Sequence, residues 1–146
     1  VCTFRQIENY KSKLSGPLID RIDIFIEVPK VKTSEFEVDE KYENAVTSKM
    51  IKDKVEKSRI IQLNRFKNTK ITFNSEMTTK EINKYCKLDL ESENILKQAI
   101  SNLNLSARAY YRILKLSRTI ADLEWSDDIK KEHILEALSF RKREEK

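Results

Sequence analysis

Glycine and proline are almost missing from this sequence of 146 residues, which contains one glycine, Gly16, and two prolines, Pro17 and Pro29. A phosphate-binding loop needs several glycines so that backbone N–H groups can approach the phosphates. Neither the G-x-x-x-x-G-K-[ST] pattern nor the G-x-G-x-x-G pattern can be written around a single glycine. The sequence therefore excludes nucleotide binding through a P-loop of its own.

Cysteine and histidine are also scarce. Cys2 and Cys86 lie far apart, with no C-x-x-C motif and no companion ligands, so the pattern supports neither a zinc site nor a disulfide framework. We therefore expect no metal site and a reducing, cytoplasmic environment. The single histidine, His133, lies in the charged stretch KKEHILEAL, and we interpret it as a surface or boundary residue rather than a catalytic base.

Long apolar runs are missing too. With 39% hydrophobic and 36% charged residues, the chain has no run that approaches the roughly 20 apolar residues needed to span a bilayer, so we expect no membrane partner. The length suits one ordinary domain, or a small domain with an appendage. The first residue is Val1 and no basic-then-apolar leader follows it, so we expect a fragment.

The chain changes character near residue 30. A short helix is predicted from Thr3 to Ser15, and Pro17 suits the first position of a second short helix that ends at Arg21. Residues 22–28 then alternate between apolar and polar side chains, a strand pattern that Pro29 ends. Residues 30–46 are polar and weakly patterned, which indicates a linker.

After the linker the pattern is helical. Capping residues and apolar spacing predict helices at 47–67, 78–86, 91–103, 106–124 and 126–141, with a brief extended piece at 71–73. The broadest apolar stripe lies in the fourth of these helices, which we expect at the centre of a bundle. Its members are Tyr110, Ile113, Leu114, Ser117, Ile120, Ala121 and Leu123.

Positive charge is concentrated in one helix. Residues 47–70 contain eight Lys or Arg and two Asp or Glu, a balance of 8 − 2 = +6, whereas the whole chain carries +5. Such a helix could attract phosphates, including those of DNA. Aromatic residues are not interleaved with the basic ones, as a base-stacking surface needs. A solvated face is therefore the favoured interpretation, and a phosphate-binding face is the alternative.

Two long stretches resemble one family. Residues 14–29, LSGPLIDRIDIFIEVP, resemble the segment near the end of the nucleotide-binding core of magnesium-chelatase-like AAA+ ATPases, in the bacterial competence-related group that contains ComM and YifB. Residues 103–141, LNLSARAYYRILKLSRTIADLEWSDDIKKEHILEALSFR, are similar to the C-terminal lid helices of that group. RFKNTKITFNSEMTTKEINKYCKLD, residues 65–89, fits the same template.

The resemblance implies a mainly α fold, with a helical-bundle AAA+ lid domain at 47–146. A short helix-strand remnant of the α/β ATPase core at 1–30 precedes it, with a linker at 31–46. The family's Walker A and Walker B motifs would lie upstream of Val1. The fragment itself is therefore expected to bind no cofactor and to be inactive, whereas the full-length protein would use ATP and Mg²⁺ and form a homo-oligomeric ring, with six subunits expected.

Two arginines match functional positions of the family. Arg21, in LIDRID, falls at the arginine finger, which would reach the γ-phosphate bound by a neighbouring subunit and stabilise the charge of the transition state. Without the resemblance, Arg21 would be a strand-entrance residue paired with Asp20 or Glu27. Arg108, in SARAYYR, falls at the second sensor and would contact nucleotide phosphates; otherwise it is an ordinary helix-surface arginine. Arg112 and Arg118 are interpreted as structural.

Three functions remain open. The first is a ring-forming ATPase that works on DNA by remodelling or branch migration; the second is the ATPase subunit of a magnesium chelatase. The third is a non-enzymatic helical module that binds phosphates or DNA through residues 47–70. We further expect the strand at 22–28, without its neighbours in the core, to pair with a second copy of the chain or with residues 71–73.

Overall fold

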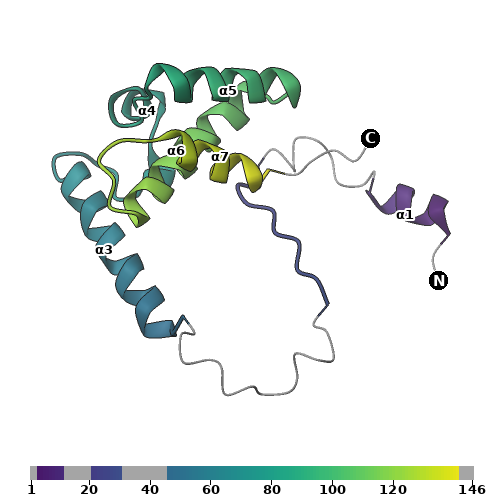
Figure 1. Ribbon diagram of the computed structural model, residues 1–146, viewed down its shortest axis with the longest axis horizontal. Coiled ribbons are helices and arrows are strands. Elements are labelled where there is room, and N and C mark those ends of the chain that lie inside the picture. Colours follow the sequence, from purple (N-terminus) through teal and green to yellow (C-terminus); the bar gives the residue numbers. More distant parts are fainter. Residues whose placement is uncertain (1–2, 12–20, 31–45, 142–146) are drawn as a thin grey trace.

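A computed structural model describes residues 3–11, 21–30 and 46–141, and these residues are mainly helical (Figure 1). Helix α1 (Phe4–Lys11) lies apart from the other helices. The remaining elements form a helical domain and confirm the mainly α fold class expected of a lid domain. They are α3 (Ser48–Phe66), the 3-10 turn η3 (Asn74–Glu76), α4 (Thr79–Tyr85), α5 (Leu90–Asn102), α6 (Ala107–Leu123) and α7 (Lys131–Ser139).

Capping side chains fix where the helices begin. The Oγ1 atom of Thr47 accepts a hydrogen bond of 3.2 Å from the backbone N–H of Met50 at the start of α3. The N-caps of α5 and α6 act in the same way, because Asp89 accepts from Ser92 N at 2.7 Å and Ser106 Oγ accepts from Ala109 N at 3.1 Å. Each cap satisfies a backbone donor that has no partner inside the helix. These three helices, and α4 as well, begin within one residue of their predicted starts.

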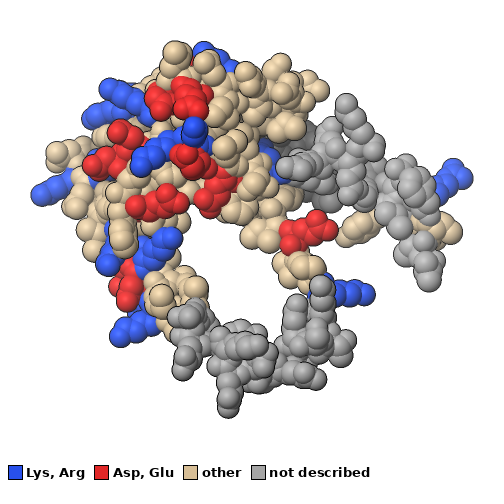
Figure 2. All heavy atoms as spheres, in the orientation of Figure 1, with Lys and Arg blue, Asp and Glu red and all other residues tan. Residues whose placement is uncertain are grey.

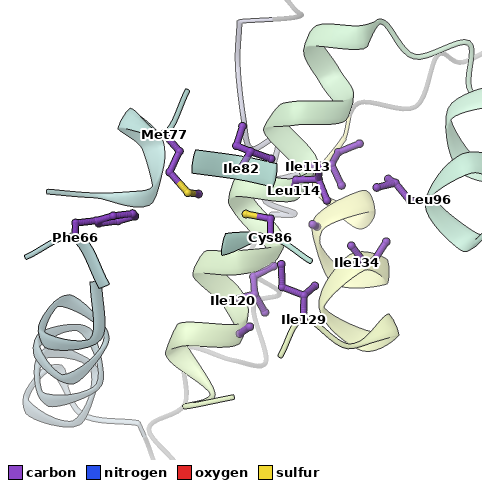
Figure 3. Close-up of a cluster of buried hydrophobic side chains, with 12 residues drawn as sticks. Phe66, Met77, Ile82, Cys86, Leu96, Ile113, Leu114, Ile120, Ile129 and Ile134 are labelled. Atoms are coloured by element: carbon purple, nitrogen blue, oxygen red, sulfur yellow. The ribbon is translucent and has the colours of Figure 1, made fainter. Parts of the chain in front are cut away.

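Helix α6 is the centre of the domain. It contacts α3, η3, α4 and α7, and Ile113, Leu114, Ile120 and Ala121 of its predicted stripe are buried. Figure 3 shows Ile113, Leu114 and Ile120 of α6 in one cluster with side chains from α4, α5 and α7. The core has the following members: Phe66, Met77, Ile82, Cys86, Leu96, Ile113, Leu114, Ile120, Ala121, Ile129, Ile134 and Ala137.

A buried ionic cluster lies beside this apolar core. The carboxylate of Asp122 is fully buried and accepts hydrogen bonds from Arg65, from Asn74 Nδ2 at 2.8 Å and from Arg118 Nε at 3.0 Å. Burial lowers the pKa of Arg118 and Asp122 opposes that shift, so the guanidinium keeps its proton at neutral pH. The cluster holds α3 and η3 against α6.

Two helices end on residues with left-handed backbone conformations that usually favour glycine. Asn104 (φ 47°) follows α5 and Trp125 (φ 57°) follows α6. In both places the next amide closes the helix end, with Leu105 N donating to Ile100 O and Ser126 N to Ala121 O. Asn tolerates this conformation, but a tryptophan there is strained by about 1 kcal/mol or more.

The predicted strand at 22–28 is wrong for this structure. Residues 22–30 adopt no strand, and the one ladder-like contact in the described residues is an isolated bridge between Leu88 and Ile129. The predicted pairing with residues 71–73 is not seen either; that segment leads directly into η3. A strand requires a neighbouring strand to take its hydrogen bonds, and no part of the described chain supplies one. Figure 1 shows residues 21–30 as an extended trace.

Two further predictions near the C-terminus are corrected. Helix α7 begins at Lys131 rather than at residue 126, because Arg118 takes the carbonyl oxygens of Ser126 and Asp127 at 2.5 and 2.7 Å. His133 is only 1% exposed rather than a surface residue. Its Nδ1 accepts from Lys130 N at 3.0 Å and its Nε2 lies 3.0 Å from Glu124 Oε2.

Other expectations fall where the chain is not described. Cys2, the predicted helix from Pro17 and most of the linker at 31–46 lie outside the described residues. Within the described ranges, no helix is both long enough and apolar enough to cross a bilayer.

Candidate functional site

Residues 21–30, here called the arm, contact the helical domain at the N-terminal half of α6 and directly after the end of α7. Nη1 of Arg112 donates a hydrogen bond of 2.6 Å to the carbonyl oxygen of Arg21 and also pairs with the carboxylate of Asp23. Nη1 of Arg141 donates to the carbonyl oxygen of Ile22 at 2.9 Å. These contacts join segments that are 91 and 119 positions apart in the chain, so they hold residues 21–23 against the helical domain.

One backbone hydrogen bond extends this attachment. The N–H of Phe25 donates to the carbonyl oxygen of Phe140 at 2.9 Å, and Phe25 is the least exposed residue of the arm. Arg141 is buried, so its charge-assisted bond to Ile22 lies away from water and is stronger for it. The first five residues of the arm are therefore held by the domain, and Arg21 stands at the held end with an exposed side chain.

Arg108 occupies the first turn of α6 and is exposed. A cation at this end of a helix is unfavourable, because the positive end of the helix dipole and the N–H groups without a partner inside the helix already lie there. The first turn of α6 contains no acidic residue that would offset it. Arg108 therefore does not stabilise α6. Together with the helix dipole it creates a positive potential that suits an anion such as a phosphate.

The two predicted site arginines lie near the same end of the domain. Arg112 follows Arg108 by four positions, so their side chains share one face of α6. Arg112 contacts the backbone of Arg21. The predicted site residues Arg21 and Arg108 therefore both lie at the N-terminal half of α6. Lys115 lies further along the helix; burial and then the charge of Arg112 lower its pKa.

Sequence analysis missed the part that Arg112 and Arg141 play. Arg112 was interpreted as structural and Arg141 was given no role, since nothing local shows that they bind the backbone of a segment about 90 residues or more away. The spacing of Arg108 and Arg112 was the one available signal. For Arg118 the structural interpretation agrees with its place beside Asp122.

A second surface combines cations and aromatic rings along α3. The Nζ atom of Lys57 lies 4.9 Å from the ring centroid of Trp125, and the guanidinium carbon of Arg59 lies 5.8 Å from that of Phe73. Both rings are exposed. Lys57, Ile60, Ile61 and Trp125 also line a shallow hollow. Figure 2 shows Lys and Arg side chains along α3, with few acidic ones between them.

The tertiary structure thus places aromatic rings beside α3, whose own basic residues are not interleaved with aromatic ones. Neither Trp125 nor Phe73 belongs to the helix, yet each lies beside one of its cations. Exposed aromatic rings beside cations are features with which proteins bind single-stranded nucleic acids. The described residues contain no group of three or more His, Cys, Asp or Glu that could hold a metal ion.

Comparison with known proteins gives two family matches in consecutive order. The family described as "Magnesium chelatase, subunit ChlI C-terminal" matches residues 45–141. The family described as "Magnesium chelatase, subunit ChlI" matches residues 1–36. The division between the two matches falls between the arm and α3.

Among curated proteins, the chain is 40% identical over 137 residues to Competence protein ComM of Haemophilus influenzae. It is 34% identical over 140 residues to the proteins called YifB of Salmonella typhimurium and of Escherichia coli. These alignments cover 94% and 96% of the chain but 26% of each relative. The chain therefore spans about a quarter of the length of the curated relatives it matches.

Proposed function

The chain belongs to the magnesium chelatase ChlI family, and from this premise we propose that it is the C-terminal part of a ring-forming AAA+ ATPase that couples ATP hydrolysis to the remodelling or branch migration of DNA. The consecutive matches at 1–36 and 45–141 carry this proposal. They fit an end of the ATPase core followed by its helical lid. The attachment of the arm to α6 gives that arrangement a physical basis.

Arg21 is the proposed arginine finger. Its guanidinium would extend from one subunit to the triphosphate bound by the next subunit of the ring. A planar, permanently charged fork can bind two phosphate oxygens and stabilise the negative charge that develops there during phosphoryl transfer. The exposed side chain of Arg21 and the domain contacts that hold its backbone support this role.

Arg108 is the proposed sensor of the nucleotide. Its position in the first turn of α6, with no acidic neighbour in that turn, fits a phosphate ligand. ATP would supply the phosphoryl group and the free energy, and Mg²⁺ would neutralise the phosphates. This chain would supply cations to the phosphates; the described residues offer no carboxylate cluster for the metal.

The basic surface of α3 supports DNA rather than a porphyrin as the substrate. A direct test measures the ATPase activity of the full-length protein alone, with single-stranded or branched DNA, and with protoporphyrin and Mg²⁺. We expect stimulation by DNA. Stimulation by protoporphyrin and Mg²⁺ but not by DNA would instead identify the ATPase subunit of a magnesium chelatase and overturn the DNA proposal.

One observation favours a second candidate, a helical module that binds phosphates or nucleic acid without catalysis. It is the pairing of Lys57 with Trp125 and of Arg59 with Phe73 on the two flanks of α3. Besides Lys57 and Arg59, residues 47–70 carry five exposed Lys side chains: Lys49, Lys52, Lys54, Lys67 and Lys70. This surface could act alone or as the DNA contact of the ATPase.

A further inference from the structure

One residue of α6 holds the backbone of the proposed finger. Arg112 donates to the carbonyl oxygen of Arg21 at 2.6 Å and pairs with Asp23, so its guanidinium lies between two groups of the arm. The side chain of Arg112 is 23% exposed and that of Asp23 is 56% exposed. The carbonyl bond fixes residue 21 itself, whereas the ion pair fixes the arm two residues later.

The same helix face connects Arg112 with the proposed nucleotide sensor. Arg108 lies one helical turn before Arg112, and α6 is a continuous helix from Ala107 to Leu123 that is packed against α3, α4 and α7. A helix packed on several sides moves as a rigid element. Any displacement of α6 that accompanies phosphate contact at Arg108 is therefore passed to Arg112 and to the backbone of residue 21.

The second attachment acts as the pivot of the arm. Arg141 donates to Ile22 O and Phe140 O accepts from Phe25 N, so the arm is also held where α7 ends. Helices α6 and α7 pack against each other. With residues 22 and 25 held where α7 ends and residue 21 held by α6, a shift of α6 relative to the end of α7 would change the orientation of residue 21.

We propose that Arg112 is a positioning residue that couples phosphate contact at Arg108 to the placement of Arg21. This inference rests on the proposed function, because it concerns the regulation of the same site. Its consequence is directional: the nucleotide bound by one subunit sets the orientation of the finger that the same subunit presents to its neighbour. Arg112 does not touch the substrate and acts only through Arg21.

The test is a double-mutant cycle in the full-length ATPase with Arg112→Ala, Arg21→Ala and both together. Misplacing a catalytic group by about 1 Å can cost about 100-fold in rate, so we expect Arg112→Ala to lower kcat by between about tenfold and about 100-fold while KM changes less than about twofold. In the Arg21→Ala background, Arg112→Ala should have no further effect on kcat. An equal loss in both backgrounds would overturn the proposal, because a merely structural role adds to the first defect.

Two further variants serve as a control and as a substitute for Arg112→Ala. Lys97→Ala removes an exposed cation of α5 that pairs with Glu93 of the same helix, and should leave kcat unchanged. If Arg112→Ala fails to fold, Asp23→Asn loosens the same attachment from the arm and leaves α6 intact; it should lower kcat in the same direction and again have no effect in the Arg21→Ala background. An unchanged kcat for Asp23→Asn and Arg112→Ala would refute the role of Arg112.

Hydrogen exchange of the full-length protein separates this inference from the proposed function. Arg112→Ala should speed amide exchange at Phe25, whose N–H donates to Phe140 O, and leave α5 unchanged. If Arg21→Ala retains full ATPase activity, the proposed function fails, whatever the arm does. If Arg21→Ala abolishes activity but Arg112→Ala alters neither kcat nor exchange in the arm, the positioning role alone is wrong.

Discussion

Arg65 and Asp122 lie 57 positions apart in the chain, yet Nη1 of Arg65 donates a hydrogen bond of 2.7 Å to Oδ2 of Asp122 and Nη2 donates to Oδ1. This two-pronged contact joins α3 to α6. Arg118 approaches the same carboxylate from within α6, so one fully buried acid satisfies two arginines. The position of the basic helix therefore depends on Asp122.

Removal of this carboxylate should strongly destabilise the domain. We expect Asp122→Ala to lower the free energy of unfolding by about 3–5 kcal/mol, because it leaves buried guanidinium groups without their counter-charge. Urea denaturation followed by circular dichroism measures the loss. The control Asp53→Ala changes an exposed acid of α3 and should stay within about 0.5 kcal/mol of the parent. A loss below about 1 kcal/mol for Asp122→Ala would contradict the view that this carboxylate holds α3 against α6.

Loss of the proposed finger should remove catalysis rather than nucleotide binding. In the full-length protein, Arg21→Ala should lower kcat by roughly 1,000-fold or more, since an arginine finger contributes about that much. Arg21→Lys should recover little, because an ammonium group lacks the planar fork of donors that matches two phosphate oxygens. Steady-state ATPase assays and nucleotide binding by calorimetry separate the two effects. Unchanged hydrolysis by Arg21→Ala would remove the basis for the finger.

The α3 surface should bind single-stranded DNA in a salt-sensitive way. Trp125 is the only tryptophan, so base stacking on it would quench the intrinsic fluorescence directly. The apparent affinity should fall steeply as salt rises, because binding releases counterions from the phosphates. Lys54→Glu with Lys57→Glu should weaken binding and reduce the salt slope, whereas Lys97→Glu on α5 should not. Fluorescence that does not respond to DNA at low salt would rule out this surface.

Substitution of Trp125 should affect DNA binding much more than stability, because its backbone conformation is strained. Trp125→Gly removes the strain of the left-handed backbone, about 1 kcal/mol. It also removes the contact with Lys57, which stabilises the protein by about 0.5–1 kcal/mol. The net change in unfolding free energy should therefore be small. DNA affinity should fall by about tenfold, because base stacking contributes about 1–3 kcal/mol. Equal affinity of Trp125→Gly and the parent, measured by fluorescence anisotropy of labelled DNA, would argue against a binding role.

Cys86 should be unreactive while the protein is folded. Burial raises the pKa of its thiol to about 11, so at pH 8 the reactive thiolate should be roughly 100-fold scarcer than for an ordinary cysteine. In a Cys2→Ser variant, iodoacetamide should label Cys86 far more slowly in buffer than in urea. The unfolded thiol loses its proton first, so stability should fall as pH rises from about 9 toward about 11. Fast labelling in buffer would show that the site is accessible.

The far end of the arm remains a candidate for contact with a second copy of the chain. Ile26 and Val28 are 70% and 82% exposed, and an extended apolar segment with unpaired backbone groups recruits other strands. We predict concentration-dependent dimers in sedimentation experiments, and Ile26→Lys should shift them toward monomers. Thr72→Lys on the helical domain is the matched control. Monomers of the parent chain at every concentration would contradict this prediction.

Local sequence determined the helices of this protein. A cap such as Thr47, Asp89 or Ser106 lies three residues from the amide it binds, and the apolar stripe of α6 repeats within one helix. Both signals depend on neighbours in the chain, so the helices at 48–66, 79–85, 90–102 and 107–123 and the central place of α6 were predictable. The family resemblance depends on the same continuous stretches.

Only the tertiary structure decided the rest, because each of these features depends on partners distant in the chain. Residues 22–28 alternate like a strand, but without a neighbouring strand they became an arm held by Arg112 and Arg141. Arg118 displaced the start of α7 by taking two carbonyl groups. The aromatic rings beside α3 came from outside that helix. Local patterns predict which segments are helical, whereas the contacts between segments follow from their packing.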